Sequence, residues 1–156
     1  MIFRTHLAFG LFIGLLAFYF QFVENWILFF LFLFFGVGFP DVDDSESKFG
    51  KKSFFKFINL FFKHRGIFHS LIFGIVLSWL AFYFDKDAGA GFFLGFLSHI
   101  ILDSFTKQGI NFLYPFGGLN AKGFIKTGGK LEKIIFYFFI LLDIFVVAKL
   151  LNSIVL

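Results

Sequence analysis

The chain contains no cysteine and few charged residues, and each shortage narrows the class of protein to which it can belong. Without cysteine it has no disulfide, no thiolate zinc ligand and no cysteine nucleophile, although the redox compartment stays undetermined. Charged residues make up 15% of the sequence, against about a quarter in soluble domains. In their place 59% of the residues are hydrophobic, 33 are phenylalanine and the mean hydropathy is +0.89. This composition predicts an integral membrane protein.

Five apolar stretches are long enough to cross about 30 Å of hydrocarbon as helices. The first run starts beside Arg4 and lacks a small-residue cleavage site, so we expect a span there and no removable signal peptide. The sequence therefore predicts an all-α membrane bundle in a single polytopic domain, residues 1–156. The expected spans lie near residues 6–22, 25–39, 67–84, 89–106 and 133–155.

Basic residues are concentrated on one side of these spans. All of the 14 lysines and arginines except Lys86 and Lys149 fall before the first span, between the second and third, or between the fourth and fifth. By the positive-inside rule this side is cytoplasmic. We therefore expect a multi-pass plasma or inner membrane protein with a cytoplasmic N-terminus and an external C-terminus. The same topology explains the net charge of +4, so no nucleic-acid partner is expected.

Residues 49–63 form a separate basic and amphipathic stretch. Its polar residues recur at spacings of four, three and four, which places them on one helical face among Phe, Ile and Leu. They are Lys52, Lys56, Asn59 and Lys63. This pattern predicts an interfacial helix in the cytoplasmic headgroup layer, attracted to anionic lipid. A helix packed against the bundle with a solvated lysine edge is the alternative.

A glycine-rich stretch of over twenty residues, 107–130, joins the fourth and fifth spans. Loops of this length often serve as lids or binding segments. A flexible connector has the same composition, and the sequence favours neither explanation.

Metal-ligand side chains gather at the cytoplasmic ends of the expected spans. All four histidines and most of the carboxylates lie there, and such groups are costly near a bilayer, which indicates a function. Imidazole and carboxylate are common ligands of zinc, manganese and iron. The convergence of these residues therefore predicts a metal site. The candidate ligands are His6, Asp41, Asp43, His64, His69, His99 and Asp103.

Spacing supports two pairs within this set. His99 and Asp103 are four residues apart, so both project from one helical face as a chelating pair, although such pairs are often structural. His64 and His69 are five apart, which is not a same-face spacing within one helix. They can act together if His64 precedes the helix and Gly66 allows a tight turn.

The candidate catalytic residues are Asp43, Arg65 and Glu132, and each has a plainer alternative role. Asp41 and Asp43 follow a proline in a rigid segment suited to bridging ions or activating water, whereas an Asp-rich turn would cap the next segment. Arg65 would neutralise a phosphate or anchor the cytoplasmic end of a span. Glu132 begins the last helix, where capping is as good an explanation as catalysis.

Asp143 lies in the middle of the last expected span. By helical rise it is about 16 Å deeper than Glu132, too far to share one ligand shell. A neutral acid hydrogen-bonded between helices and a proton-relay group are both compatible with this position.

A series of short motifs runs from the first expected span to the start of the last. They are Thr5-His6, Pro40-Asp41-Val42-Asp43, His64-Arg65-Gly66 with His69-Ser70, His99 with Asp103, Gly109, Tyr114-Pro115, and Gly128 with Glu132. With these motifs the chain resembles the YdjM-type family of membrane-bound, predicted metal-dependent hydrolases. The resemblance implies a distant similarity to zinc-dependent phospholipase C and P1-type nucleases, helical enzymes whose zinc clusters hydrolyse phosphoesters. In that family the aspartate motif is often followed by histidine, whereas Asp44 here makes the site more oxygen-rich.

We therefore expect a membrane-embedded, metal-dependent hydrolase that cleaves a phosphoester at the cytoplasmic membrane face. It would hold two or three divalent ions, with zinc favoured and manganese or magnesium as alternatives. Asp43 would be a ligand or the base, and Arg65 would stabilise developing negative charge. Membrane lipids are expected partners, and the interfacial helix favours a phospholipid or another amphiphilic phosphate as substrate.

Two other functions stay open. A metal or proton transporter ranks second, because its ligands should be distributed across the bilayer instead of clustering at one face. A non-catalytic scaffold tied together by metal ranks third, because structural zinc sites are usually closed and often rich in cysteine.

Overall fold

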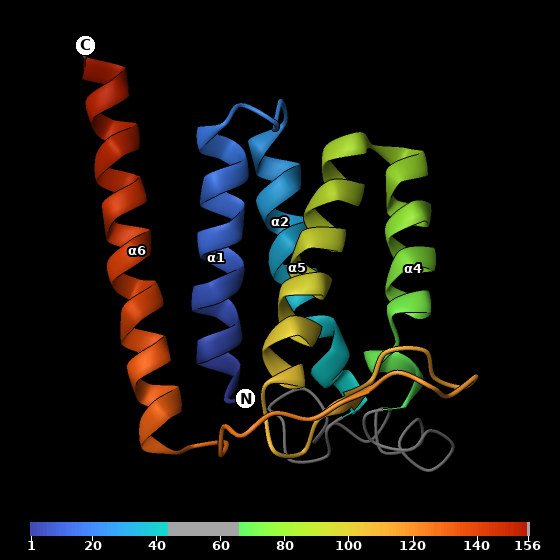
Figure 1. Ribbon diagram of the computed structural model, residues 1–156. Helices are drawn as coiled ribbons and strands as arrows, with labels where there is room; N and C mark the ends of the chain where they lie inside the picture. The colour runs from blue at the N-terminus through green and yellow to red at the C-terminus, as the bar shows by residue number, and fades with distance from the viewer. Residues whose placement is uncertain (44–65, 156) are drawn as a thin grey trace.

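The described part of the chain is a set of side-by-side helices with one small hairpin at one end (Figure 1). The structure is a computed structural model that describes residues 1–43 and 66–155. The prediction of a mainly helical fold is confirmed, and the only strands among the described residues form the hairpin of β1 (Ile110–Asn111) and β2 (Asn120–Ala121). The expected interfacial helix, Asp44, His64 and Arg65 lie outside the described residues. The helices are α1 (Phe3–Tyr19), α2 (Trp26–Gly38), α4 (Leu71–Phe84), α5 (Lys86–Ser104) and α6 (Lys130–Val155), with the 3-10 turns η1 (Phe39–Asp43) and η2 (Ile67–His69).

Among the described residues, α6 is the one helix both long and apolar enough to cross a membrane. Its stretch Lys130–Ser153 has a mean hydropathy of 2.5 over its most apolar part. The helices α1, α2 and α4 are apolar but have 17, 13 and 14 residues, against about 20 needed to span the hydrocarbon. The 19-residue α5 begins with Lys86 and Asp87, carries Asp103 just before its last residue and is rich in glycine. Five spans therefore stay a prediction.

Side-chain caps define two of the helix starts. The Asn25 side chain accepts a hydrogen bond from the Leu28 amide at 3.2 Å, which caps α2. The Asp85 carboxylate accepts from the amides of Asp87 and Ala88, each at 2.9 Å, which caps α5. Both caps lie at the end of the bundle opposite to the hairpin (Figure 1).

Several helix boundaries differ from the expected ones, and three of the differences concern candidate site residues. The first helix begins at Phe3, so His6 lies within its first turn. The third expected span is divided, because Ser70 has an extended backbone between η2 and α4. The last helix begins at Lys130, three residues before the expected span, so that Glu132 lies inside its first turn.

The helix α5 packs against α2, α4 and α1, whereas α6 packs mainly against α1. Glycines allow the closest of these approaches, since a Cβ at Gly91 or Gly95 of α5 would collide with the backbone of α2 at Phe29 or Leu33. Such tight packing fixes the position of α5 relative to α2. A buried cluster of Phe92, Phe96, Ile100 and Ile110 lies beside this contact, with Phe32 of α2 and Leu71 and Leu77 of α4 packed against it.

The hairpin is fastened to the ends of two helices. Directly after α5, the Ile125 amide donates to the Phe105 carbonyl at 3.0 Å. At the start of α4, the Leu71 amide donates to the Phe112 carbonyl at 2.9 Å. The hairpin therefore crosses the end of the bundle where α1 and α6 begin (Figure 1).

Candidate metal centre

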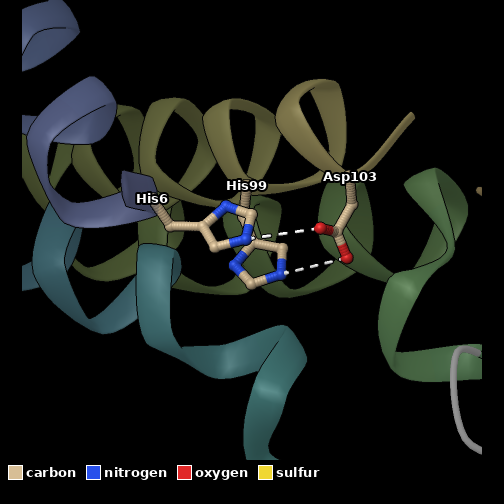
Figure 2. A group of neighbouring side chains, drawn as sticks. All are labelled: His6, His99 and Asp103. Carbon is tan, nitrogen blue, oxygen red and sulfur yellow. Dashed lines mark ion pairs between the residues drawn. The ribbon is translucent and has the colours of Figure 1, made fainter. Parts of the chain in front are cut away.

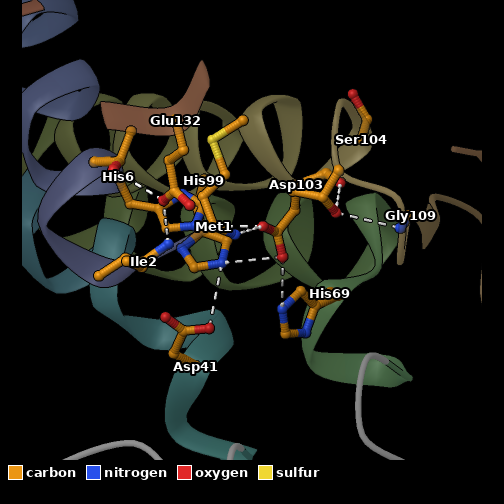
Figure 3. Close-up of polar contacts among 12 residues, drawn as sticks. Met1, Ile2, His6, Asp41, His69, His99, Asp103, Ser104, Gly109 and Glu132 are labelled. Carbon is orange, nitrogen blue, oxygen red and sulfur yellow. Dashed lines mark hydrogen bonds and ion pairs between the residues drawn. The ribbon is translucent and has the colours of Figure 1, made fainter. Parts of the chain in front are cut away.

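Five side chains of the metal-ligand type meet at the hairpin end of the bundle. His6 comes from α1, Asp41 from η1, His69 from η2, and His99 and Asp103 from α5. Ligand atoms lie within 4.8 Å of one another in two groups, one of His6, His99 and Asp103 and one of Asp41, His69 and His99 (Figures 2 and 3). The structure thus brings these five candidate ligands together, and their binding of an ion stays a prediction.

His99 is oriented by the end of α2. Because α2 ends at Gly38, the Val37 carbonyl has no partner within the helix. The Nδ1 atom of His99 lies 2.8 Å from that carbonyl oxygen, which can only accept. In the neutral ring this contact assigns the proton to Nδ1 and leaves the lone pair on Nε2. That Nε2 lies 3.5 Å from Asp41 Oδ1 and 3.8 Å from Asp103 Oδ2.

Asp103 faces four cationic or potentially cationic groups, one of which is His99. Its Oδ1 atom lies 3.3 Å from His6 Nε2 and also contacts the terminal ammonium of Met1. Its Oδ2 atom lies 3.7 Å from His69 Nε2. The carboxylate is buried, so its charge must be balanced by neighbours. Its two oxygens are therefore directed to different histidines.

The imidazole rings of His6 and His99 stack on each other within the centre. The ring centroids are 3.8 Å apart and the planes are inclined by 5°. The Nε2 atoms of both rings face the Asp103 carboxylate (Figure 2). Within the part of the chain that the structure describes, neither nitrogen of His6 has a hydrogen-bond partner, although the residue is fully buried. A buried polar atom without a partner lowers the folding stability by about 1–3 kcal/mol, so His6 without a ligand destabilises the fold.

The donor atoms are spaced as ligands of a common ion would be. The nitrogen–oxygen separations of 3.3–3.8 Å exceed those of good hydrogen bonds. Two ligands held 2.0–2.1 Å from a tetrahedral zinc ion would lie about 3.3 Å apart. The imidazole and carboxylate set also suits zinc or manganese. Because the two groups share the single free nitrogen of His99, the five side chains would hold at least one divalent ion between them.

The centre is most open at η1. The Asp41 side chain is 20% exposed, whereas those of His6, His69, His99 and Asp103 are exposed by 1% or less. A molecule entering from outside would therefore meet Asp41 first.

Glu132 lies beside the centre and holds α1 against α6. Its Oε1 atom accepts hydrogen bonds from the Ile2 amide at 2.5 Å and the Thr5 hydroxyl at 3.0 Å. Its Oε2 atom accepts from the Gly128 amide at 2.5 Å. Glu132 belongs to neither ligand group. These contacts account for its burial, and its catalytic role stays a prediction.

The remaining candidates are not placed in the centre. Asp43 ends η1, and its side chain is outside the described part, as are His64 and Arg65. Their roles stay predictions. Asp143 is buried on α6, and neither of its carboxylate oxygens has a hydrogen-bond partner among the described residues.

Sequence reasoning missed two groups at this centre. The Val37 carbonyl is a backbone atom, but the glycine and proline that follow it mark a helix end, and helix ends leave carbonyls without partners. That signal could have marked it as a carbonyl in need of a donor, but not which side chain supplies the donor. The Met1 ammonium carries no such signal, because its contact with Asp103 arises only from the tertiary structure.

Comparisons with known proteins agree with a membrane setting. A family model described as "YdjM inner membrane protein" matches residues 1–153. An uncharacterized protein, YvsG, from Bacillus subtilis (strain 168) is 33% identical over 62% of this chain and 63% of its own length. The inner membrane protein YdjM of Escherichia coli (strain K12) is 38% identical over 49% of this chain and 43% of its own length, and that of Shigella flexneri gives the same values. The matches thus span less than two thirds of these relatives. No solved structure matches.

Proposed function

The chain belongs to the YdjM inner membrane protein family, and from that premise we propose that it is a membrane-embedded, metal-dependent hydrolase of phosphoesters. The observation that supports this proposal best is His6, a fully buried histidine whose ring nitrogens lack hydrogen-bond partners among the described residues while they face Asp103 and the ring of His99. Imidazoles arranged in this way are suited to hold a cation. The mixed ligand set with a half-buried Asp41 at its edge is typical of open, catalytic centres.

The chain's own residues would prepare the site. His6, His69, His99, Asp41 and Asp103 would hold the ion or ions, with the Val37 carbonyl fixing the orientation of His99. A divalent ion bound there would lower the pKa of a water molecule and polarise the phosphoryl group of the substrate. Asp103, buried and shared between His6 and His69, would keep the ligands in register.

The substrate would approach at η1. Asp41 is the exposed ligand, and Asp43 follows it closely in the sequence as a further ligand or general base. Arg65 would stabilise the charge that develops on the phosphoryl oxygens. Because the centre lies at one end of a membrane-embedded bundle, a phospholipid or another amphiphilic phosphate fits this position best.

The basic loops indicate how the protein would lie in the membrane. The exposed Lys107, Lys122, Lys126 and Lys130 are at the same end of the chain's fold as the candidate centre. By the positive-inside rule that end faces the cytoplasm, with several helices crossing the bilayer and the C-terminus outside.

Metal analysis of the detergent-purified full chain tests the proposal directly. We expect at least one equivalent of zinc or manganese in the wild type and its loss in His69→Ala and Asp103→Ala, since each removes a ligand of the shared site. Asp143→Asn is the matched control, because it alters a buried carboxylate away from the centre and should keep the metal. Mass spectrometry of the metals, with light scattering to show that each variant stays monodisperse, provides the measurement.

The outcomes separate the candidate functions. No metal in the wild type, and none bound on titration with zinc or manganese, would exclude the hydrolase. If metal is present, Asp43→Ala distinguishes an enzyme from a scaffold. Loss of phosphoester turnover with metal retained supports the enzyme, and loss of metal together with the fold supports the scaffold.

A transporter is the second candidate because of Asp143. This carboxylate is buried within the long apolar α6 and has no hydrogen-bond partner among the described residues. Intramembrane acids of this kind occur in proton relays. The clustering of the other acids and histidines at one end of the bundle ranks this function below the hydrolase.

A further inference from the structure

The segment of residues 105–126, here called the hairpin segment, exposes large apolar side chains at the same end as the candidate metal centre. Phe116 is 83% exposed, Phe124 70% and Leu119 57%. Phe116 and Leu119 flank the hairpin tip at Gly117 and Gly118, which have positive φ angles and no neighbouring atoms within 4 Å of an added Cβ. The tip therefore projects away from the helices. Phe124 follows β2 and lies near the base of the hairpin.

The charge of the hairpin segment has one sign. It contains three lysines and no aspartate or glutamate. Lys107, Lys122 and Lys126 are all exposed, and none of them forms an ion pair within the described part of the chain. Exposed aromatic and aliphatic side chains beside unpaired lysines are the composition of a surface that lies in anionic headgroups.

The segment is rigidly joined to two of the candidate ligands. After Asp103, the buried Thr106 donates from its hydroxyl to the Asp103 carbonyl at 2.7 Å and accepts at its own carbonyl from the Gly123 amide at 3.0 Å. After His69, the Ser70 hydroxyl donates to the Phe112 carbonyl at 3.3 Å. A surface that binds the hairpin segment would therefore also fix the depth of the centre.

We infer that the hairpin segment is a lipid-binding element whose tip inserts into the headgroup layer of an anionic phospholipid bilayer. The partner is assigned by charge complementarity, since the segment offers only positive charge around its apolar tip. This inference rests on the proposed function in that it brings the centre to the depth of lipid phosphoesters. The binding itself requires neither metal nor turnover.

Depth measurements on the full chain in vesicles test the inference. Because the chain has no cysteine, single spin labels can be placed with Phe116→Cys and Phe124→Cys. The vesicles contain phosphatidylcholine with phosphatidylglycerol, and label collisions with oxygen and with a water-soluble nickel chelate report depth. Control labels at Leu141→Cys, exposed on α6, and Glu24→Cys, exposed at the far end, mark hydrocarbon and water.

We expect both hairpin labels to collide more with oxygen and less with nickel than the Glu24 label does. Nickel collisions equal to those of the Glu24 label would overturn the inference, because the tip would then be in water. Low collision rates with both reagents would overturn it as well, because protein would then cover the tip.

The lysines provide a second test. In the wild type, phosphatidylglycerol should move the hairpin labels deeper into the bilayer. A variant with Lys107→Gln, Lys122→Gln and Lys126→Gln should lose this effect. The ratio of inserted to free hairpin segment should fall about fivefold for each lysine removed. Lys149→Gln, also exposed but near the end of α6, should change nothing. Unchanged lipid dependence in the triple variant would contradict the assigned partner.

The two proposals fail separately. Inserted hairpin labels in a protein that binds no metal would exclude the hydrolase and leave the lipid-binding segment standing. A metal-loaded protein whose hairpin labels are in water would do the reverse.

Discussion

The carboxylate of Glu132 is buried at the junction of α1 and α6, and its two oxygens accept three hydrogen bonds. Two of the donors belong to the first turn region of α1, which also bears His6, one residue after Thr5. Glu132 thus acts on the centre through the position of α1. A residue that positions another should affect stability and metal content together, whereas a residue that acts only on substrate should affect turnover alone.

We expect Glu132→Ala to lower the free energy of unfolding by about 2–4 kcal/mol, because it leaves buried donors of Ile2 and Thr5 without an acceptor. Thermal unfolding in detergent, followed by tryptophan fluorescence, measures this. Glu24→Gln is the matched control, since it breaks only an exposed ion pair with Lys86, which solvent screens, and should leave stability unchanged within experimental error. Equal stability of Glu132→Ala and wild type with turnover abolished would instead support catalysis by Glu132.

At the scale of single residues, the sequence predicts pairs of candidate ligands that lie close to each other in the chain. His99 and Asp103 could be paired from the sequence because four residues make one helical turn, and the structure places both in one centre. The partner of His99 at Val37 could not, because 62 residues separate them and only the packing of α5 on α2 brings them together. The contacts of Glu132 depend on tertiary structure in the same way.

Among the elements, the pair of α2 and α5 sets the geometry of the centre. Gly95 lies against the backbone of α2, where an added Cβ would be 2.9 Å from the Val37 amide nitrogen and would collide with the Leu33 carbonyl. The carbonyl of the same Val37 orients His99, one turn further along α5. The distance between α2 and α5 therefore determines where the candidate ligand atom Nε2 of His99 lies.

We expect Gly95→Ala to destabilise the protein by about 1–3 kcal/mol and to lower its metal content, because α5 must move away from α2. Gly38→Ala is the control, since its Cβ would meet the Phe3 ring at an ordinary 3.6 Å and should change stability by less than about 1 kcal/mol. Unfolding curves and metal analysis of both variants provide the measurement. Full metal content in a destabilised Gly95→Ala would show that helix spacing and ligand geometry are independent.

The elements also show which parts of a fold can be predicted from sequence. Hydrophobic runs predict that helices exist near residues 6–22, 25–39, 67–84, 89–106 and 133–155, and helices are present in all five ranges. Their ends were less accurate, because the start of α1 is fixed by Glu132, far along the chain, and α4 is shortened by the extended Ser70. The small hairpin was not expected, since its strands have two residues each and no alternating pattern.

For the whole molecule, the polar groups are distributed unevenly along the bundle. The five clustered candidate ligands occupy one end, and Asp143 stands alone within α6, about 16 Å from Glu132 by helical rise. A hydrolase needs the first set only. A transporter needs both, because its ion must cross the bilayer.

If the chain is the proposed hydrolase, we expect Asp143→Asn to keep its metal and its phosphoester turnover, within about twofold of wild type, because helical rise places this carboxylate about 16 Å from Glu132 at the hairpin end. Turnover and pH-driven proton flux are measured on the same proteoliposome preparation. Asp103→Ala, which removes a ligand, is the comparison that should abolish turnover. A metal-dependent flux in wild type that Asp143→Asn eliminates would establish the transporter instead.

The contacts around the start of α1 also set an order of assembly. The Met1 ammonium meets Asp103 across 102 residues, and the Ile2 amide meets Glu132 across 130. At a synthesis rate of about 5–20 residues per second, several seconds or more pass between the emergence of α1 and that of these partners. During this time His6 has neither Asp103 nor His99 beside it. The nascent protein therefore cannot bring the candidate ligands of α1 and α5 together until α5 is made, and cannot form the contacts of Ile2 and Thr5 with Glu132 until α6 begins.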